Sequence, residues 1–268
     1  MKRIHLALAA ALLALMACSN GKKAQYAEEE EEEPLPERYE NDDLPKAADE
    51  LFDDFAYYFA SNEQLQRRRI SFPLQLESSK GKSLMEEDQW TMDSLFMTAG
   101  QSTVILDEPE QREQLSDSTV NTITIEKIFF ALDSVRQYVF CRNDGRWMLY
   151  AIRQQRLADN ANAPFLGFLH TFATDSAFQQ NSLSSEIEFS GPDPDDDFAR
   201  LEGFITPDSW EAFAPELPQD SIYNIVYTKA DDRSQEKTLF ICGISNGQEL
   251  EITFRQKRGR WKLAKLAQ

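Results

Sequence analysis

Few side chains in this sequence have a type and spacing that would support catalysis. The sequence contains only two histidines, His5 and His170, and His5 lies in an N-terminal segment that we expect to be removed. His170 is then the sole imidazole, so any Ser-His-Asp or Cys-His arrangement would have to use it. Metal sites that need several histidine ligands are excluded for the same reason. The sequence therefore suggests no catalytic residue.

Arg67, Arg68 and Arg69 form the only dense basic cluster in the part of the chain that we expect to fold. They follow a predicted helix, and cations are stabilised near the negative C-terminal end of a helix by about 0.3–1 kcal/mol each. A site for an anionic ligand is the alternative interpretation. These three arginines are the candidate ligand-binding residues of the sequence.

An acidic run at 193–197 places four carboxylates in five residues. Calcium-binding loops need oxygen ligands at fixed spacing and usually a glycine for the sharp turn, and this run has no glycine. Pro192 and Pro194 favour an extended, exposed loop. We therefore predict no metal site and no cofactor.

Three cysteines are present, and Cys18 belongs to the N-terminal processing region. The other two, Cys141 and Cys242, are too few for a disulfide-rich scaffold. We predict that both are free thiols that pack as small hydrophobic side chains. A single disulfide in an oxidising compartment is the alternative.

The first 18 residues have the pattern of an export signal. Lys2 and Arg3 give a basic start, and a largely apolar run extends from residue 4 to residue 16. This run is too short to span a bilayer, which needs about 20 apolar residues. The Leu-Met-Ala-Cys sequence that ends at Cys18 resembles the lipobox of bacterial lipoproteins. The resemblance implies cleavage directly before Cys18 and attachment of lipid to its sulfur.

We predict that this lipid anchors the protein in the cell envelope. Ser19 stands where an aspartate would favour retention in the inner membrane, so we expect the outer membrane, with a periplasmic or a surface orientation. The residues that follow include six consecutive glutamates, Glu28–Glu33, and two prolines soon after them. Such a block repels itself and stays extended, so we predict an acidic tether.

Comparison of the chain with itself indicates two copies of one folding unit. Residues 59–66 align with residues 172–179 at an offset of 113. Residues 145–149 align with residues 259–263 at an offset of 114. Two separate matches at almost one offset imply that the elements between them kept their number.

This repeat defines the predicted organisation of the chain. Between the two matches, Trp90 pairs with Phe204, and Tyr57 takes the place of His170. A histidine that is replaced by tyrosine in the other copy is best interpreted as a packing residue. The predicted segments are a signal peptide at 1–17, a lipidated cysteine and tether at 18–46, a first domain at 47–158 and a second domain at 159–268.

Each predicted domain begins with helices and ends with strands. Apolar stripes indicate helices at 51–59 and 165–172, the second capped by Asn162. A short helix follows each, capped by Ser61 or Asn62 and by Thr174 or Asp175. Strands are indicated at 70–76, 123–132, 135–141 and 146–152 in the first copy, and at 187–189, 223–228, 239–244, 249–256 and 261–266 in the second, with a β-meander at the end of each copy. The predicted fold class is α+β, with two repeated domains, each of N-terminal helices packed on a curved antiparallel sheet.

This order of elements resembles the nuclear transport factor 2-like (cystatin-like) superfamily, in which helices and a curved sheet form a cone. The whole chain is also similar to uncharacterised bacterial lipoproteins that contain domains of unknown function. Enzymes of that superfamily place acidic residues, tyrosine or histidine inside the cone, and no spacing in this sequence singles out such a pair.

Charge and composition limit the classes of function that are possible. The formal net charge is -18, which argues against nucleic acid as a partner. We predict a membrane-anchored envelope lipoprotein that binds a protein or a small molecule and is not an enzyme. The alternative is an enzyme with an acid–base pocket inside one cone. An open cone with convergent polar groups would favour the alternative, and a cone filled by Phe, Trp and Met would favour binding.

Overall fold

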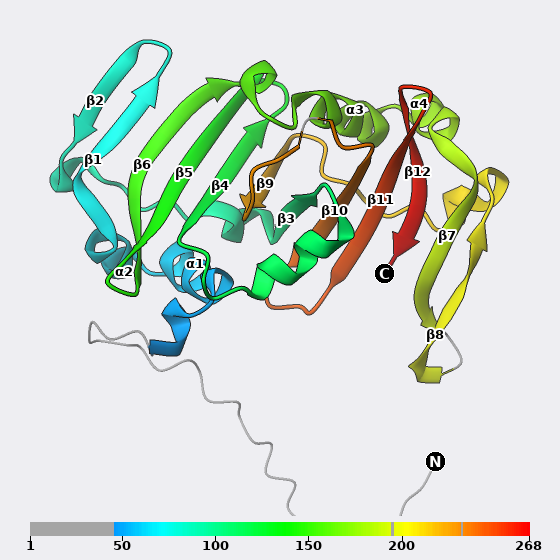
Figure 1. The fold of residues 1–268 in the computed structure, drawn as a ribbon, viewed down its shortest axis with the longest axis horizontal. Helices are drawn as coiled ribbons and strands as arrows, with labels where there is room; N and C mark the ends of the chain where they lie inside the picture. The colour runs from blue at the N-terminus through cyan, green and yellow to red at the C-terminus, as the bar shows by residue number, and fades with distance from the viewer. Residues whose placement is uncertain (1–45, 194–195, 232) are drawn as a thin grey trace, which may run out of the picture. The chain divides into compact units, whose positions relative to one another are not determined.

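The computed structural model describes residues 46–193, 196–231 and 233–268 (Figure 1). The predicted signal peptide, Cys18 and the acidic tether before residue 46 lie outside the described residues. Among the helices of the described part, none is long and apolar enough to cross a bilayer. These residues have an α+β fold with few helices and a large curved sheet, as the sequence predicts.

The described residues form a twelve-stranded sheet in the order β2-β1-β6-β5-β4-β9-β3-β10-β11-β12-β7-β8. The pairs β1–β6, β3–β9 and β7–β12 are parallel, and the other pairs are antiparallel. The strands are β1 (Ile70–Ser78), β2 (Gly81–Met85), β3 (Gln101–Leu106), β4 (Thr122–Phe129), β5 (Ser134–Asn143), β6 (Arg146–Arg156), β7 (Leu183–Asp193), β8 (Asp196–Ile205), β9 (Ser221–Val226), β10 (Glu236–Gly243), β11 (Glu249–Lys257) and β12 (Arg260–Ala267).

The two halves of the chain repeat one order of elements: two helices, a hairpin, an irregular segment and four further strands. The helices are α1 (Phe52–Ser61), α2 (Glu63–Arg68), α3 (Ala163–Thr174) and α4 (Ser176–Asn181), and the 3₁₀ segments are η1 (Lys46–Asp49), η2 (Glu87–Gln89), η3 (Leu95–Ala99), η4 (Pro109–Ser116), η5 (Leu157–Asp159) and η6 (Pro207–Ala212). Trp147 and Trp261 lie in β6 and β12, the last strand of each half. The division into two domains at residue 158 stays a prediction, because both halves share one sheet.

Each half contributes one strand to the part of the sheet built by the other half. β9 pairs with β4, and β3 pairs with β10. The two exchanged strands meet in the middle of the sheet, where Thr103 lies beside Asn224 (Figure 1). The prediction that residues 223–228 form a meander with the strand that follows them is therefore wrong, because β3 lies between β9 and β10.

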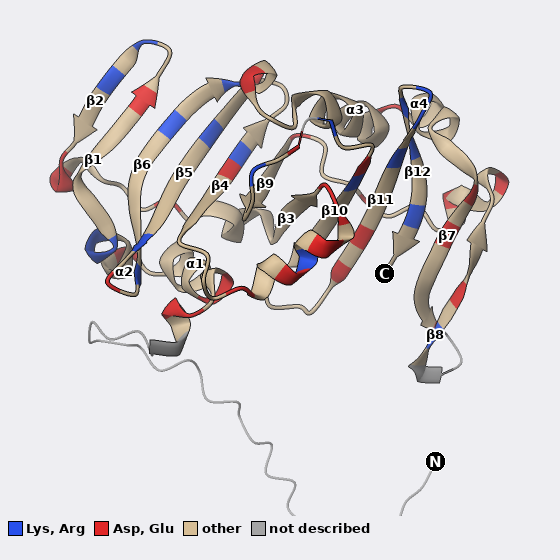
Figure 2. Ribbon diagram, viewed as in Figure 1, with Lys and Arg blue, Asp and Glu red and all other residues tan. Residues whose placement is uncertain are grey.

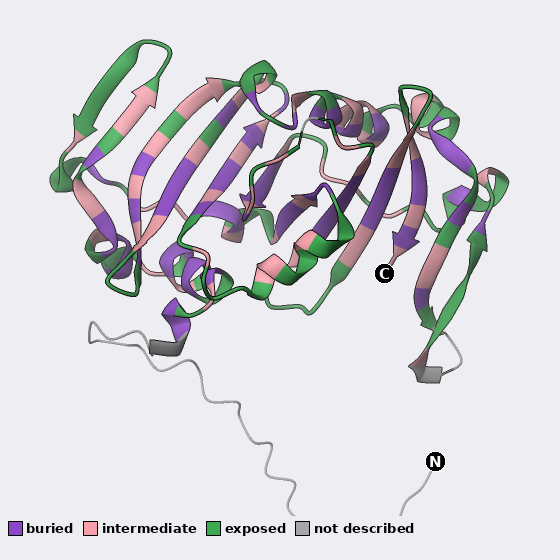
Figure 3. Cartoon of the chain, in the orientation of Figure 1, coloured by how far each residue is buried: buried purple, intermediate pink, exposed green. Residues whose placement is uncertain are grey.

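Two hydrophobic cores lie on opposite faces of the sheet. Successive side chains of a strand point to opposite faces, and β10 illustrates the result. Leu239 and Ile241 pack into the core beneath α3, whereas Phe240 belongs to the core beneath α1. Figure 3 shows the buried positions concentrated in the central strands, with the edge strand β2 largely exposed.

The predicted caps of the short helices are confirmed. The Asn62 side chain accepts a hydrogen bond from the amide of Leu65 at 3.0 Å, and Asp175 accepts one from Phe178 at 2.9 Å. Asn162 is the N-cap residue of α3, as predicted, but its side chain forms no capping hydrogen bond. Its side-chain oxygen instead accepts a hydrogen bond from a buried lysine of β10.

Cys141 and Cys242 are free thiols, as predicted, and both are half-buried. Burial raises the pKa of the Cys242 thiol to about 11, and the nearby carboxylates of Glu249 and Asp53 act in the same direction. A thiolate is the reactive form of cysteine. Cys242 therefore behaves as a packing residue and not as a nucleophile.

Candidate ligand-binding groove

Aromatic side chains fill the interior beneath the helices on both faces of the sheet. Beneath α1, Phe140 and Trp147 are at most 1% exposed. Beneath α3, the rings of Phe165 and Phe172 meet Phe254 edge-on, with centroids 5.7 and 5.2 Å apart. These are the positions at which an open cone would hold its pocket. Aromatic side chains fill these positions, and such filling is expected in a binding protein and not in an acid–base enzyme.

A groove lies on the face of β10–β12 opposite α3. Its floor consists of side chains that face one another across neighbouring strands. The first row is Leu106, Thr238, Thr253, Lys265 and Glu188, and the second row is Phe240, Glu251 and Ala267. The hydroxyls of Thr238 and Thr253 lie 3.0 Å apart. The short side chains of Thr238 and Thr253 in the first row and of Ala267 in the second leave the space that longer charged side chains border.

The 3₁₀ segment η4 covers one side of the groove, and its Arg112 is the central contact. The Arg112 guanidinium lies 5.0 Å from the centre of the Phe240 ring. It also lies 3.3 Å from Glu251 and 3.9 Å from Glu249. A cation that stacks on an aromatic face between two carboxylates is held in one orientation. Figure 2 shows η4, with its charged residues, crossing in front of β10 and β11.

Ion pairs continue along the rest of the groove. Arg255 binds Glu236 at 2.7 Å and Glu188 at 3.1 Å. Lys265 binds the second oxygen of Glu251 at 2.7 Å. Such pairs are partly exposed, so each adds only about 0–1 kcal/mol to stability. Their main effect is to hold donors and acceptors in fixed positions around the groove.

The groove comprises two adjoining hollows of about 250 and 270 Å³ that share Arg112, Phe240 and Glu251. The first hollow extends toward Arg200 and the second toward Arg255. Each hollow is smaller than the usual ligand pocket of about 300–1,000 Å³, so each has room for one ring of a larger ligand. Because β11 rises about 3.3 Å per residue, the span from Glu249 to Arg255 is on the order of 20 Å.

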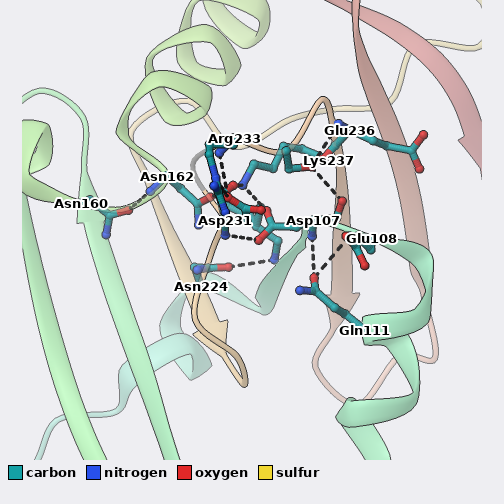
Figure 4. A network of polar contacts seen from close by, with 12 residues as sticks. Asp107, Glu108, Gln111, Asn160, Asn162, Asn224, Asp231, Arg233, Glu236 and Lys237 are labelled. Atoms are coloured by element: carbon teal, nitrogen blue, oxygen red, sulfur yellow. Dashed lines mark hydrogen bonds and ion pairs between the residues drawn. The ribbon is translucent and has the colours of Figure 1, made fainter.

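A buried polar network fixes the start of η4 (Figure 4). The Lys237 ammonium pairs with the Asp107 carboxylate and donates to Asn162 at 2.8 Å. Gln111 of η4 accepts a hydrogen bond from the Asp107 amide at 2.6 Å. Lys237 and Asp107 are 3% and 5% exposed. The ion pair thus joins β10 to the end of β3, from which η4 and Arg112 extend over the groove.

The network continues to a second buried carboxylate, that of Glu126 on β4. One oxygen of Glu126 accepts hydrogen bonds from Gln137 at 2.8 Å and Asn160 at 2.7 Å. The other accepts one from Asn224 of the exchanged strand β9 at 3.2 Å. Asn160 also accepts a hydrogen bond from the amide of Asn162. Side chains from both halves therefore satisfy the buried charges at the exchange.

The structure gives each arginine of the predicted basic cluster a different environment. Arg67 donates to the carbonyl groups of Glu87 and Trp90. Arg69 forms a buried two-point ion pair with Asp49, with both distances 2.8 Å. Arg68 and Arg69 both line a surface hollow, together with Asn143, Asp144 and Arg146. Arg67 is not part of this lining, and an anionic ligand at the cluster stays a prediction.

The remaining chemically distinctive residues have structural contacts. His170 stacks on Phe130, with ring centres 4.6 Å apart, which supports its interpretation as a packing residue. The prediction that the acidic run is a loop is wrong for its described residues, because Asp193 ends β7, Asp196 and Asp197 begin β8, and Asp193 pairs with Asp196. The side chains of 194–198 lie outside the described residues. Within the described part, no three His, Cys, Asp or Glu side chains are arranged to hold a metal ion.

A glutamine occupies the same position in both halves, buried as Gln66 and half-buried as Gln179. Gln66 donates to the carbonyl of Phe59 at 2.8 Å and accepts from the Trp90 indole at 3.1 Å. Gln179 donates to the carbonyl of Phe172 and accepts from the Trp210 indole, at 3.1 and 3.0 Å. The predicted pairing of Trp90 with Phe204 is therefore wrong, because Trp210 makes the equivalent bond.

We expect Gln66→Ala to destabilise the protein more than Gln179→Ala. Gln66 is fully buried and also bonds the amide and the carbonyl of Asp93. Its removal leaves buried polar groups without partners, at about 3 kcal/mol in total, against about 1.5 kcal/mol for the two bonds of Gln179. Urea denaturation measures both losses. Equal losses of unfolding free energy in the two variants would contradict the larger hydrogen-bonding role given to Gln66.

Tyr138 with Asp93 is one of two tyrosine–carboxylate pairs at the first core, and Tyr227 with Asp53 is the other. The Tyr138 hydroxyl donates to the Asp93 carboxylate. Burial raises the pKa of Tyr138 well above its ordinary value, and the Asp93 charge raises it further. A general acid works best with a pKa near the operating pH. The pair therefore serves the packing of the first core better than proton transfer.

Comparisons with known proteins agree with this fold. The model of the family described as Domain of unknown function (DUF4348) matches residues 31–268. A solved nuclear transport factor 2-like protein from Bacteroides fragilis NCTC 9343 has a TM-score of 0.77 and 36% sequence identity, and the match covers 85% of this chain and 98% of that chain. A comparison with curated proteins gave no match. The chain therefore belongs to the DUF4348 family and has a nuclear transport factor 2-like fold.

Proposed function

We propose that this protein is an outer-membrane lipoprotein, anchored through Cys18, whose folded part binds a small polar ligand in the groove beside η4. The observation that carries the binding proposal is the convergence of Arg112, Phe240 and Glu251 on two adjoining hollows. Concave sites with a few fixed polar groups are the usual binding sites of small ligands. The groove also joins both halves, because η4 follows the exchanged strand β3.

One feature of the groove supports binding over catalysis. The charged side chains of the groove are already in ion pairs, with Arg255 and Lys265 each bound to a glutamate. A catalytic acid or base needs a perturbed protonation equilibrium and a free path to its substrate. Paired side chains, by contrast, are well suited to present donors and acceptors without changing their charge.

A blocked groove tests the binding function. The full chain is screened by thermal shift against a library of small polar metabolites, including sugars, amino acids and short peptides. Ala267→Phe fills one hollow, so it should abolish the shift that any binder produces. Ser83→Phe on the exposed strand β2 is the matched control and should keep the shift. Ligands that shift both variants equally, or a library without a binder, would refute the proposal.

The anchor is tested separately. Cells fed a fatty-acid analogue should label the wild-type protein and leave Cys18→Ala unlabelled and soluble, because the lipid is attached to that sulfur. Equal labelling of the two proteins would refute the anchor and leave the binding proposal intact.

A further inference from the structure

We propose that the groove binds a short neutral saccharide, with the ring of Phe204 as a stacking surface at the β8 side. This inference rests on the proposed binding function and adds the chemical class of the ligand. Three observations carry it: the balanced charge of the lining, the unused hydrogen-bonding capacity of its ion pairs, and an exposed aromatic ring on the same face.

The lining of the larger hollow has no net charge, although the chain as a whole carries -18. Its charged members are Arg112, Arg255 and Lys265, and Glu188, Glu236 and Glu251. A ligand with net charge would have to compete with ion pairs that already exist. If a charged ligand displaced one member of an ion pair, the charge of the other member would be left without a partner, which is unfavourable. The lining therefore favours a neutral ligand over an anion or a cation.

The ion pairs keep donors and acceptors that face the hollow. Lys265 has three N–H donors, and Glu251 accepts from one of them. Each Glu251 oxygen binds one cation and can accept a second hydrogen bond. A sugar hydroxyl is both donor and acceptor, so neighbouring hydroxyls can bond an ammonium and a carboxylate at once. A polyol can therefore bind without breaking any existing pair.

Phe204 supplies the apolar contact that a sugar ring needs. It lies directly opposite Glu188 in the β7–β8 pairing, and opposed residues of an antiparallel pair share a face. Phe204 therefore lies on the groove face, and it is 69% exposed. The face of an aromatic ring is electron-rich, which favours contact with the C–H groups of a pyranose. In the neighbouring register pair, Phe189 packs into the core beneath α3, so the two faces are distinct.

Binding to neutral and charged ligands tests this assignment. The full chain is applied to an array of neutral and acidic oligosaccharides, and hits are measured as free trisaccharides by calorimetry beside triglycine as a zwitterionic probe. We expect a neutral oligosaccharide to bind and Phe204→Ala to weaken it at least tenfold. Phe213→Ala, which removes another exposed ring that contacts Phe189, should leave the affinity unchanged. Thermal melting confirms that both variants are folded.

Each result decides the matter. Neutral saccharide binding that depends on Phe204 and weakens in Glu251→Gln supports the inference. Triglycine or an acidic oligosaccharide that binds in a groove-dependent way, with no neutral binder, overturns the saccharide assignment while the binding function stands. Saccharide binding that neither variant changes places the ligand elsewhere and overturns the site. No binder of any class overturns the inference and the proposed function together.

Discussion

Lys237→Met should lower the free energy of unfolding by about 3–5 kcal/mol, the usual loss when one partner of a buried ion pair is removed. The Lys237 ammonium pairs with Asp107 and also donates to Asn162 and to the carbonyl of Asp231. Methionine fills a similar volume but leaves the Asp107 carboxylate buried without a cation. Urea denaturation of wild type and variant measures the difference.

Lys265→Met is the matched control, because Lys265 also pairs with a carboxylate, that of Glu251, but its side chain is 35% exposed. It should cost about 0–1 kcal/mol. The double variant Lys237→Met with Asp107→Asn should recover part of the loss, since it removes the unpaired charge. If the buried and the exposed lysine cost the same, Asp107 and Lys237 do not form a buried pair in solution.

The same substitution links stability to the groove. Asp107 directly follows β3, and its amide donates to Gln111 in the first turn of η4, which positions Arg112. Loss of the ion pair should therefore weaken any ligand of the groove, whereas destabilisation elsewhere in the sheet should not. The scaffold behind a binding site commonly determines how well its contacts are placed.

Local sequence patterns were sufficient to locate most of the helices and strands along the chain. Apolar stripes located α1 and α3, and Asn62 and Asp175 marked the starts of α2 and α4, because capping depends on side chains within one turn. Alternation located the strands that close each half. β2, β3 and β8 were missed, and β2 is almost wholly exposed and shows no apolar alternation.

The pairing of Trp90 failed for a different reason. The offset between the copies is 113 to 114 at both ends, but Trp90 and Trp210 differ by 120. The hairpin between them is longer in the second half, where β7 and β8 have 11 and 10 residues against 9 and 5 in β1 and β2. A constant offset at the ends therefore concealed an insertion in the middle.

The groove could not be predicted from the sequence. Arg112 and Phe240 lie in different halves, and they meet because β3 pairs with β10. A strand of suitable pattern can pair with its own half or with the other, and alternation is the same in both cases. The charged residues of β11, Glu249, Glu251 and Arg255, were visible as alternate positions. Without the register they are typical of any solvated face.

The exchange of β3 and β9 leads to the second large expected effect. Produced as separate chains, residues 46–158 and 159–268 should each lack a cooperative thermal transition, and the mixture should assemble into a folded one-to-one complex. Alone, the first half would bury Asp107 without Lys237, and Glu126 without Asn160 and Asn224. Buried carboxylates without partners are strongly unfavourable. Circular dichroism and size-exclusion chromatography measure folding and assembly.

A single substitution separates specific assembly from general association. Asn224→Asp would place a second carboxylate against Glu126, 3.2 Å away in the wild type, so it should prevent or greatly weaken assembly of the two chains. Asn246→Asp, in the exposed turn between β10 and β11, makes the same chemical change away from the exchange and should have little effect. Two separate chains that each melt cooperatively would instead mean that the halves are independent domains, as the boundary at residue 158 predicts. In that case β3 would not pair with β10, and Arg112 would not be held over Phe240.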